Sequence, residues 1–373
     1  MSEPNVQDTN EPSDPRLRLA AVGDLLLATT PDDPAAGRDL DAMFEGVRAA
    51  LAGCDVVLAN LECTLPGGAV VSTEPRVIAS EELIRAAAAA GVGVVSLAHN
   101  HAFDCGVEGF ENLRPLLDEL GVAHFGAGRD LDEATAPAIV EADGVSLAIL
   151  GGADASTGAY HFAGPGQPGV APLDVEGLRE RIADLHSRVD HVIVAAHWGE
   201  ERFAVPSPRQ IAQARSLVEA GASAVLGHHP HVLQGMETYR GRPIAYSLGN
   251  FVANEVPLSD GDAIRWGRPG RTGCVLRMDL RPGGVDDIEQ IATHDDGLRI
   301  EVDRSRWARR RLAKLNRAVA GGVSPRRYRR EHVRVHVVRP FLGYLRWSRL
   351  TRVRPRHVSK ALREVLHSRK RNV

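Results

Sequence analysis

The sequence predicts a layered α/β fold built on buried parallel strands, for two reasons. Nearly continuous apolar runs recur between residues 17 and 231, LRLAAVGDLLLA and HVIVAAHWGE among them, and such runs suit strands that are buried on both faces. Stretches with helical spacing separate these runs, and strand–helix alternation is typical of layered α/β folds. Around residues 240–302 strands and turns follow one another, which predicts a mixed or antiparallel later sheet.

Two of the predicted helices have clear boundaries. Ser80 precedes two glutamates and Gly91 follows the helical stretch, so a helix is expected between them. Ser207 followed by Pro208 predicts the start of a second helix, which Gly221 would end.

Charge divides the chain into unlike parts. Residues 304–373 carry 23 Lys and Arg against two acidic residues, a net charge of +21, while the rest of the 373-residue chain has a net charge of −24. We therefore expect a disordered acidic leader over 1–15, a globular domain over 16–302, and a basic, Arg-rich helical region over 303–373.

Composition and cysteine usage predict a cytoplasmic globular protein. Hydrophobic residues make up 43% and charged residues 25%, which is ordinary globular usage. The N-terminus is polar and acidic, unlike a secretion signal, and no apolar run of about 18 residues predicts a membrane span. The cysteines lack metal-motif spacing, so free thiols in a reducing compartment are expected at Cys54, Cys63, Cys105 and Cys274.

Polar side chains gather where five apolar runs end. Because ligands bind at the carboxyl ends of strands in α/β folds, we expect these side chains to meet at one edge. Carboxylates and imidazoles are ligands of divalent transition metals, and an amide oxygen can complete a shell, so the pattern predicts a metal site. The residues concerned are Asp24, Asn60, Glu62, His99, Asn100, His101, Asp104, His197, Glu200, His228, His229 and His231.

Several of these residues also have simpler interpretations when taken alone. Asp24 fits a turn residue and His197 fits a core histidine. Asp104 fits the cap of the helix that follows it, and His99 and His228 fit histidines that bond the backbone.

For His101, His229 and His231 the functional interpretation prevails, because the motifs HNH, HWGE and GHHPH occur in one chain. In an extended segment His229 and His231 would point to one side and His228 to the other. The sequence contains no GxSxG elbow, no Walker A loop and no GxGxxG after a strand.

Six motifs in order resemble those of the CapA family of capsule and poly-γ-glutamate synthesis proteins. They are VGD, NLE, SLAHNHAFDCG, AAHWGEE, GHHPHVLQG and YSLGNF, and they span about Arg16 to Asn254. That family is similar to the calcineurin-like metallophosphoesterases. The resemblance implies a four-layer α/β/β/α sandwich with a metal site at the sheet edge, and it does not reach the basic region.

The resemblance also implies roles for individual residues. The metal ligands would be Asp24, Glu62 as a bridging carboxylate (or, less well, Asn60), Asn100, His197, His229 and His231. His101 would be the catalytic acid or would contact the substrate. The residues around them, in contact with substrate or ligands, would be Asn60, His99, Asp104, Glu200, His228 and Asn250.

The resemblance leaves one or two metal ions open. Calcineurin-like enzymes carry a histidine two residues past the first aspartate, and this chain has Leu26 there, as the CapA pattern does. Mn, Fe, Zn and Mg all tolerate mixed shells of this kind.

The expected function is that of a metal-dependent hydrolase, acting on a phosphoester or a related bond in anionic-polymer metabolism. The alternative is a non-catalytic accessory protein of polyanionic polymer synthesis with a structural metal site. We expect the apolar stripes of the basic region to pack on the domain. We expect its positive charge to contact a polyanionic polymer or an anionic membrane surface. Nucleic acid is disfavoured as a partner because no recognised module accompanies the charge.

Overall fold

The computed structural model describes residues 15–33, 35–68 and 74–338. The predicted leader therefore lies outside the described residues except for Pro15, as does the part of the basic region after Val338.

The larger sheet has eight strands and is mixed. Its order is β18-β17-β16-β1-β2-β3-β4, and β13 also pairs with β1. The strands are β1 Leu17–Leu26, β2 Val56–Asn60, β3 Val94–Ser96, β4 Ala123–Phe125, β13 Asn250–Ala253, β16 Thr272–Arg281, β17 Gly284–Asp295 and β18 Ile300–Val302. Strands β1 to β4 run parallel, whereas β16, β17 and β18 are antiparallel, which confirms the predicted change of pattern.

The second sheet has six strands in the order β11-β12-β10-β9-β7-β6. These are β6 Ala138–Ala142, β7 Val145–Ala153, β9 His191–His197, β10 Ala224–His228, β11 Met236–Tyr239 and β12 Arg242–Ala245. Its four central strands are parallel, and β6 and β11 are antiparallel edge strands. Two small ribbons pair β5 Ala127–Gly128 with β8 Gly169–Val170, and β14 Val256–Pro257 with β15 Ala263–Ile264.

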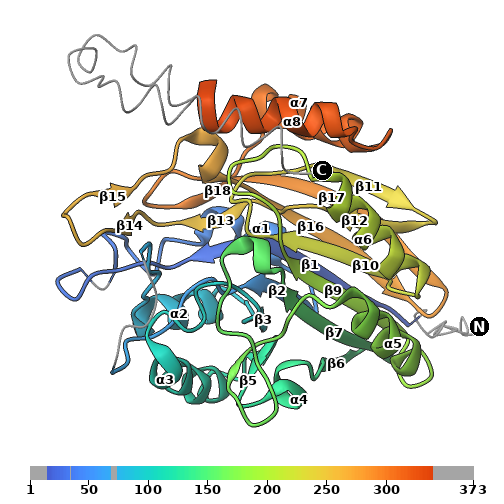
Figure 1. The fold of residues 1–373 in the computed structure, drawn as a ribbon, viewed down its shortest axis with the longest axis horizontal. Helices are drawn as coiled ribbons and strands as arrows, with labels where there is room; N and C mark the ends of the chain where they lie inside the picture. The colour runs from blue at the N-terminus through green and yellow to red at the C-terminus, as the bar shows by residue number, and fades with distance from the viewer. Residues whose placement is uncertain (1–14, 34, 69–73, 339–373) are drawn as a thin grey trace, which may run out of the picture.

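The two sheets pack face to face between two layers of helices (Figure 1). Leu19 and Ala21 of β1 lie in one apolar cluster with Ile193 and Leu226 of the second sheet. The alternate residue Ala20 faces the opposite cluster, which includes the first group of helices. The helices over the larger sheet are α1 Arg48–Leu51, α2 Glu81–Ala89 and α3 Gly106–Glu119, and those over the second sheet are α5 Val175–Leu185 and α6 Pro208–Glu219. The four-layer sandwich is thereby confirmed, with short helix α4 Leu131–Ala134 beside it.

Both predicted helix boundaries are confirmed by their caps. Ser80 Oγ accepts a hydrogen bond from the Leu83 backbone N–H at 3.3 Å. Ser207 and Gln210 form a reciprocal capping box at the start of α6. Gly91 and Gly221 follow the two helices with φ of +104° and +116°, which glycine adopts without steric cost.

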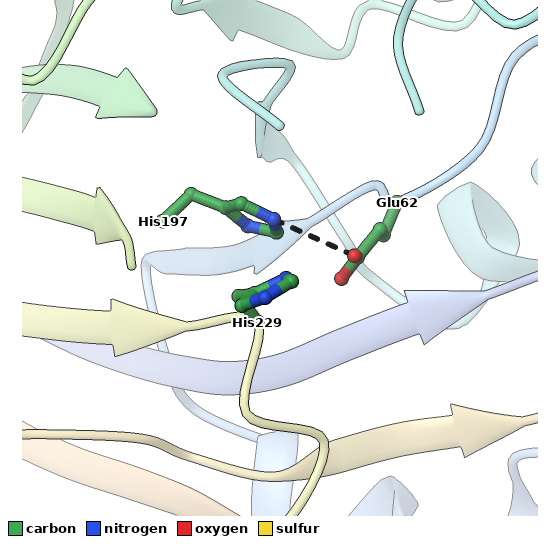
Figure 2. A group of neighbouring side chains, drawn as sticks. All are labelled: Glu62, His197 and His229. Carbon is green, nitrogen blue, oxygen red and sulfur yellow. Dashed lines mark ion pairs between the residues drawn. The ribbon is translucent and has the colours of Figure 1, made fainter. Parts of the chain in front are cut away.

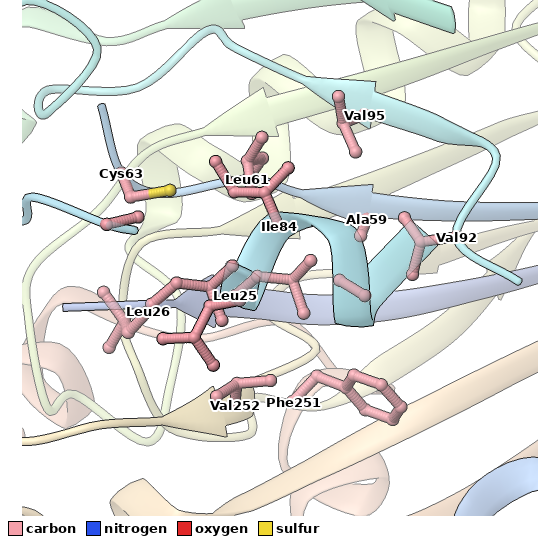
Figure 3. Packing of buried hydrophobic residues seen from close by; sticks show 14 of the residues in the cluster. Leu25, Leu26, Ala59, Leu61, Cys63, Ile84, Val92, Val95, Phe251 and Val252 are labelled. Carbon is pink, nitrogen blue, oxygen red and sulfur yellow. The ribbon is translucent and has the colours of Figure 1, made fainter. Parts of the chain in front are cut away.

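The residues that follow Asp24 belong to the apolar core. Figure 3 shows Leu25 and Leu26 among Leu61, Ile84 and other side chains of the cluster between the larger sheet and its helices. Leu26 is 1% exposed, so the position that carries histidine in calcineurin-like enzymes is here a packing position.

The first part of the basic region forms helices that pack on the domain. Helix α7, Arg306–Val319, lies along β11 and β17, and α8, Pro325–Val333, follows and continues into a π-helical turn, Arg334–Val338. Leu315 and Val319 are buried against the sandwich. The Asn316 amide accepts from the Met236 backbone N–H at 2.9 Å and donates to Gln290 at 2.6 Å. Within the described ranges, no helix is long and apolar enough to cross a bilayer.

A buried ion pair joins the start of the domain to the end of the larger sheet. Arg38 donates to both Asp295 oxygens, at 3.1 and 2.7 Å, and neither side chain is more than 1% exposed. Replacing Asp295 with alanine leaves a buried guanidinium without its partner, so we expect a loss of about 3–5 kcal/mol in the free energy of unfolding. Urea unfolding measures it.

The matched control is Asp262→Ala. Asp262 pairs with Arg265 at 2.7 Å, but these side chains are 66% and 61% exposed. Removing such a surface pair costs at most about 1 kcal/mol. Equal unfolding midpoints for the two variants would contradict the importance of the buried pair.

Candidate metal centre

Strand ends from both sheets meet at one place. Asp24 of β1 is in register with Asn60 of β2 and with Asn250 of β13. In the second sheet His228 of β10 is in register with His197 of β9. A contact of 3.1 Å between Asp24 Oδ1 and His228 Nδ1 joins the two sets, so the site lies between the sheets.

Two groups of three candidate ligands share Glu62. One group is Glu62, His197 and His229, and the other is Asp24, Glu62 and His231; within each group the ligand atoms lie within 4.8 Å of one another. Figure 2 shows the His197 and His229 rings beside the Glu62 carboxylate, which stands on the loop after β2. Glu62 Oε1 is 3.5 Å from His197 Nε2 and 3.6 Å from His231 Nε2, so it lies between the two groups.

The backbone that carries the two histidines after β10 is turned, not extended. His229 has φ of +90° and His231 has φ of +55°, so the prediction of an extended segment is wrong. Such conformations cost non-glycine residues roughly 1–3 kcal/mol and persist only where the surroundings impose them. Here the His229 N–H donates to Asp24 at 3.3 Å and the Pro230 carbonyl accepts from the Arg202 N–H at 2.7 Å. These turns give one histidine to each group.

Asn60 and Asn100 hold neighbouring side chains of the site in place. Asn60 Nδ2 donates to Asp24 Oδ1 at 3.0 Å and to Glu62 Oε2 at 3.1 Å, so this amide aligns both carboxylates. Asn100 Oδ1 accepts from His197 Nε2 at 2.8 Å, and its Nδ2 is 3.0 Å from His101 Nε2. Asn100 therefore lies between His197, of the group of Glu62, His197 and His229, and His101.

His101 is paired with Asp104 through its other ring nitrogen. His101 Nδ1 lies 2.8 Å from Asp104 Oδ2, which also accepts from the Val77 N–H at 2.9 Å. Both side chains are buried. The cap of α3 is Cys105, so the interpretation of Asp104 as a helix cap is wrong.

Two of the remaining predicted residues, Asn250 and His99, contact these groups. Asn250 Oδ1 is 3.0 Å from His231 Nδ1, while its amide donates to the Gly270 carbonyl at 2.8 Å. His99 Nδ1 accepts from the His101 N–H at 3.2 Å, and its ring lies 6.0 Å from that of His197. Glu200 is half-buried after β9, and its carbonyl accepts from the Phe203 N–H.

Burial keeps two of the ligand imidazoles neutral. Burial and the adjacent His231 lower the pKa of His229 to about 4. Burial and the neighbouring His229 lower the pKa of His197 well below its usual value. Neutral imidazoles offer the lone pair that a metal requires.

The carboxylates act in the opposite direction on His231. Burial alone would lower its pKa, but Glu62 and Asp24 raise the pKa of His231 to about 10. Burial in turn raises the pKa of Glu62 well above its usual value. A cation bound beside Glu62 and His231 would favour the deprotonated forms of both side chains, which are the forms that bind metal.

The donor set fits a divalent metal. Glu62 Oε1 and His229 Nδ1 are buried and have no hydrogen-bond partner among the described residues. Leaving such groups unpaired costs about 1–3 kcal/mol each, and a bound cation would satisfy them. Two carboxylates and three imidazoles suit a divalent transition metal, and the structure does not specify which ion.

Three residues at the rim were not predicted from the sequence. Trp266 places its ring 5.2 Å from that of His231, and the Arg202 guanidinium lies 5.7 Å from the centre of the Trp266 ring. Although burial would raise it, His231 and His229 hold the pKa of the Glu201 carboxyl below its usual value, so this charge acts on both ligands. Glu201 directly follows the predicted Glu200, so its position after an apolar run could have indicated a site residue. The loop that carries Trp266 follows no apolar run, so nothing in the sequence indicated that Trp266 lies near the site.

Comparison with known proteins identifies the family. The family model described as "Bacterial capsule synthesis protein PGA_cap" matches residues 18–255, which include every candidate ligand. The chain belongs to this bacterial capsule synthesis protein family. The resemblance to the CapA family is thereby confirmed.

Relatives in this PGA_cap family carry related names. "Capsule biosynthesis protein CapA" of Bacillus anthracis is 32% identical over 285 residues, covering 74% of this chain and 67% of the relative. "PGA biosynthesis protein CapA" of Bacillus subtilis is 32% identical over 281 residues, covering 74% and 71%. A "Probable polyglutamine synthesis accessory protein" of Mycobacterium tuberculosis is 30% identical, covering 70% and 73%. Among solved structures, a putative 5′-nucleotidase from Staphylococcus aureus aligns with a TM-score of 0.46 and 12% identity, covering 81% of this chain and 58% of that one.

Proposed function

We propose that this PGA_cap protein is a metal-dependent hydrolase that cleaves a phosphoester, or a related ester or amide bond, in the metabolism of an anionic polymer. One observation carries the proposal: two ligand groups share Glu62, and the His101–Asp104 pair lies beside them through Asn100. The names of the CapA relatives support the polymer class, with poly-γ-glutamate as the first candidate.

The chain's own residues divide the chemical work. A divalent ion held by the two groups would supply positive charge to a substrate oxyanion. Asp104 holds the Nδ1–H of His101, which leaves Nε2 facing Asn100 and the ligand groups. Protonated at Nε2, His101 would donate that proton to the leaving group, and the Asp104 carboxylate would stabilise the imidazolium before transfer.

Hydrolysis of an aryl phosphate tests this function. We expect the purified full chain to hydrolyse p-nitrophenyl phosphate, to lose the activity after treatment with a chelator, and to regain it with Mn or Zn. Released nitrophenolate measures turnover, and elemental analysis of the same samples measures bound metal. A protein that binds metal but hydrolyses neither this ester nor an aryl carboxylate ester or anilide would contradict the proposal.

The second candidate is a non-catalytic accessory protein with a structural metal site. Two observations favour it: the position two residues past Asp24 is the core residue Leu26 where calcineurin-like enzymes have a histidine, and one relative is named an accessory protein. In this case metal removal lowers the melting temperature, because the ion binds only the folded chain, while no preparation shows turnover.

A further inference from the structure

The outer faces of α7 and α8 carry basic side chains without acidic partners. The exposed residues are Arg306, Arg309, Arg310, Lys314 and Arg317 on α7, and Arg326, Arg329 and Arg330 on α8. Within the described part of the chain, none of these eight side chains forms an ion pair or hydrogen bond. Several exposed arginines elsewhere are paired, as Arg179 is with Glu176 and Arg188 with Asp184. We call these eight residues the basic face.

Two acidic residues next to the basic face in the chain, Glu331 and Asp303, are engaged with other groups. Glu331 accepts from the Ala204 backbone N–H at 2.8 Å and pairs with Arg334. Asp303 pairs with Arg268 at 3.3 Å. The basic face therefore keeps its positive charge, and arginine forks match carboxylate or phosphate oxygens in pairs.

The apolar sides of both helices are turned toward the domain. Leu315 and Val319 of α7 are buried, and Tyr328 of α8 packs against Phe203 with ring centres 5.3 Å apart. Among the described residues after Val302, Val338 is the one large apolar side chain counted as exposed, at 42%. A helix that binds a bilayer surface inserts an apolar face, and here that face is occupied. A soluble polyanion fits the basic face better than a membrane does.

A groove lies along the α8 part of the basic face. Its volume is about 390 Å³, and it is lined by Arg326, Arg329, Arg330, Val333, Arg334 and Val338. Three of these arginines, Arg326, Arg329 and Arg330, belong to the basic face, whereas Arg334 pairs with Glu331. Three unpaired charges along one helix suit a linear chain of anionic groups more than a single small anion.

The two loops at the rim of the metal centre rest on these helices. Arg202 precedes Phe203, whose ring packs against Tyr328 and, at 5.9 Å, against His332 of α8. On the other side, the Arg268 guanidinium lies 4.3 Å from the centre of the Trp307 ring of α7. Arg268 is two residues from Trp266, which contacts His231. The basic face and the metal centre are thus joined through both rim loops.

We infer that the basic face binds a linear polycarboxylate and presents it to the metal centre, with Arg202 as the basic residue at the rim. The binding surface follows from the unpaired charge and the groove. The presentation to the metal centre, and the choice of carboxylate over phosphate, rest on the proposed function.

Charge reversal on the full chain tests this surface. One variant changes Arg326, Arg329 and Arg330 of α8 to glutamate, and a second changes Arg306, Arg310 and Arg317 of α7. The probe is fluorescent poly-L-glutamate, with binding measured by anisotropy at low and high salt. We expect each variant to bind roughly tenfold or more weakly at low salt, since each exposed charge contact contributes a few-fold, and we expect high salt to remove most of the difference.

The matched control reverses three other exposed arginines and so changes the net charge equally: Arg48 of α1, Arg179 of α5 and Arg188 in the turn after α5. It should bind more tightly than either test variant, and all variants should keep wild-type metal content. Equal binding by control and test variants would overturn the inference, as would binding to polyphosphate or phosphatidylserine vesicles but not to poly-L-glutamate. If the expected losses occur in a protein that hydrolyses no aryl substrate, the surface stands and the proposed hydrolase fails.

Discussion

Replacing Glu62 with glutamine is expected to abolish divalent metal binding. Glu62 belongs to both ligand groups and is 0% exposed, so its replacement removes one buried ligand from each group. The amide keeps the size of the side chain and removes its charge. Elemental analysis after reconstitution with Mn should therefore show little bound metal, compared with one or two equivalents in the natural protein.

Thermal unfolding provides a second measurement of the same loss. An ion that binds only the folded chain contributes about 2.7 kcal/mol when its concentration is one hundred times its dissociation constant. The natural protein should gain that stability on adding Mn, and Glu62→Gln should gain none. His231→Ala removes a ligand from the group of Asp24, Glu62 and His231 only. Metal retained by this variant would indicate that the group of Glu62, His197 and His229 binds an ion without the other group.

Glu237→Gln is the matched control. Glu237 is also a buried carboxylate, but it pairs with Arg215 at 2.7 Å and accepts from the Tyr246 hydroxyl, outside both ligand groups. Its replacement should lower stability and leave metal content unchanged. Full metal content in Glu62→Gln would show that Glu62 is not a ligand.

The second large effect is expected at His101. His101→Ala should lower turnover of the aryl phosphate by about 10²–10⁴-fold, because that is the usual contribution of a positioned general acid. Metal content should not change, since His101 is outside both ligand groups. Steady-state rates and elemental analysis on the same preparation separate the two effects.

Asp104 and His124 complete this test. Asp104→Asn removes the charge that orients His101 and should reduce turnover less than His101→Ala does. His124→Ala is the control, because this histidine lies on β4, outside both ligand groups, where its Nδ1 is 3.4 Å from the Val122 carbonyl and 3.9 Å from Asp118. Wild-type turnover by His101→Ala would exclude His101 as the acid.

The strand-end rule explains why so much of the site was visible in the sequence. Central parallel strands are buried on both faces, so β9 is a run of apolar residues ended by His197, and β1 and β2 give the same signal before Asp24 and Asn60. The order of the strands within each sheet could not be predicted from the sequence in the same way. Strand β13 pairs with β1 although more than two hundred residues separate them, and no local pattern encodes such a pairing.

The features of the site that could not be predicted from the sequence depend on tertiary contacts. His229 and His231 were predicted as ligands, but their left-handed backbone depends on hydrogen bonds to Asp24 and from Arg202, which are distant in the chain. Trp266 reaches His231 from a loop that bears no strand-end signal. The prediction of a metal role for each residue rests on the motifs and the family, and the variants above test it.

The position of the site between the sheets makes it a late product of folding. The contact between Asp24 and His228 closes a separation of 204 residues, and each sheet alone supplies only part of the ligand set. A contact between residues this far apart in sequence forms slowly, because closing so long a loop costs the chain conformational entropy. A nascent or half-folded chain therefore has no complete metal centre, so any hydrolysis it catalyses begins only once both sheets have docked.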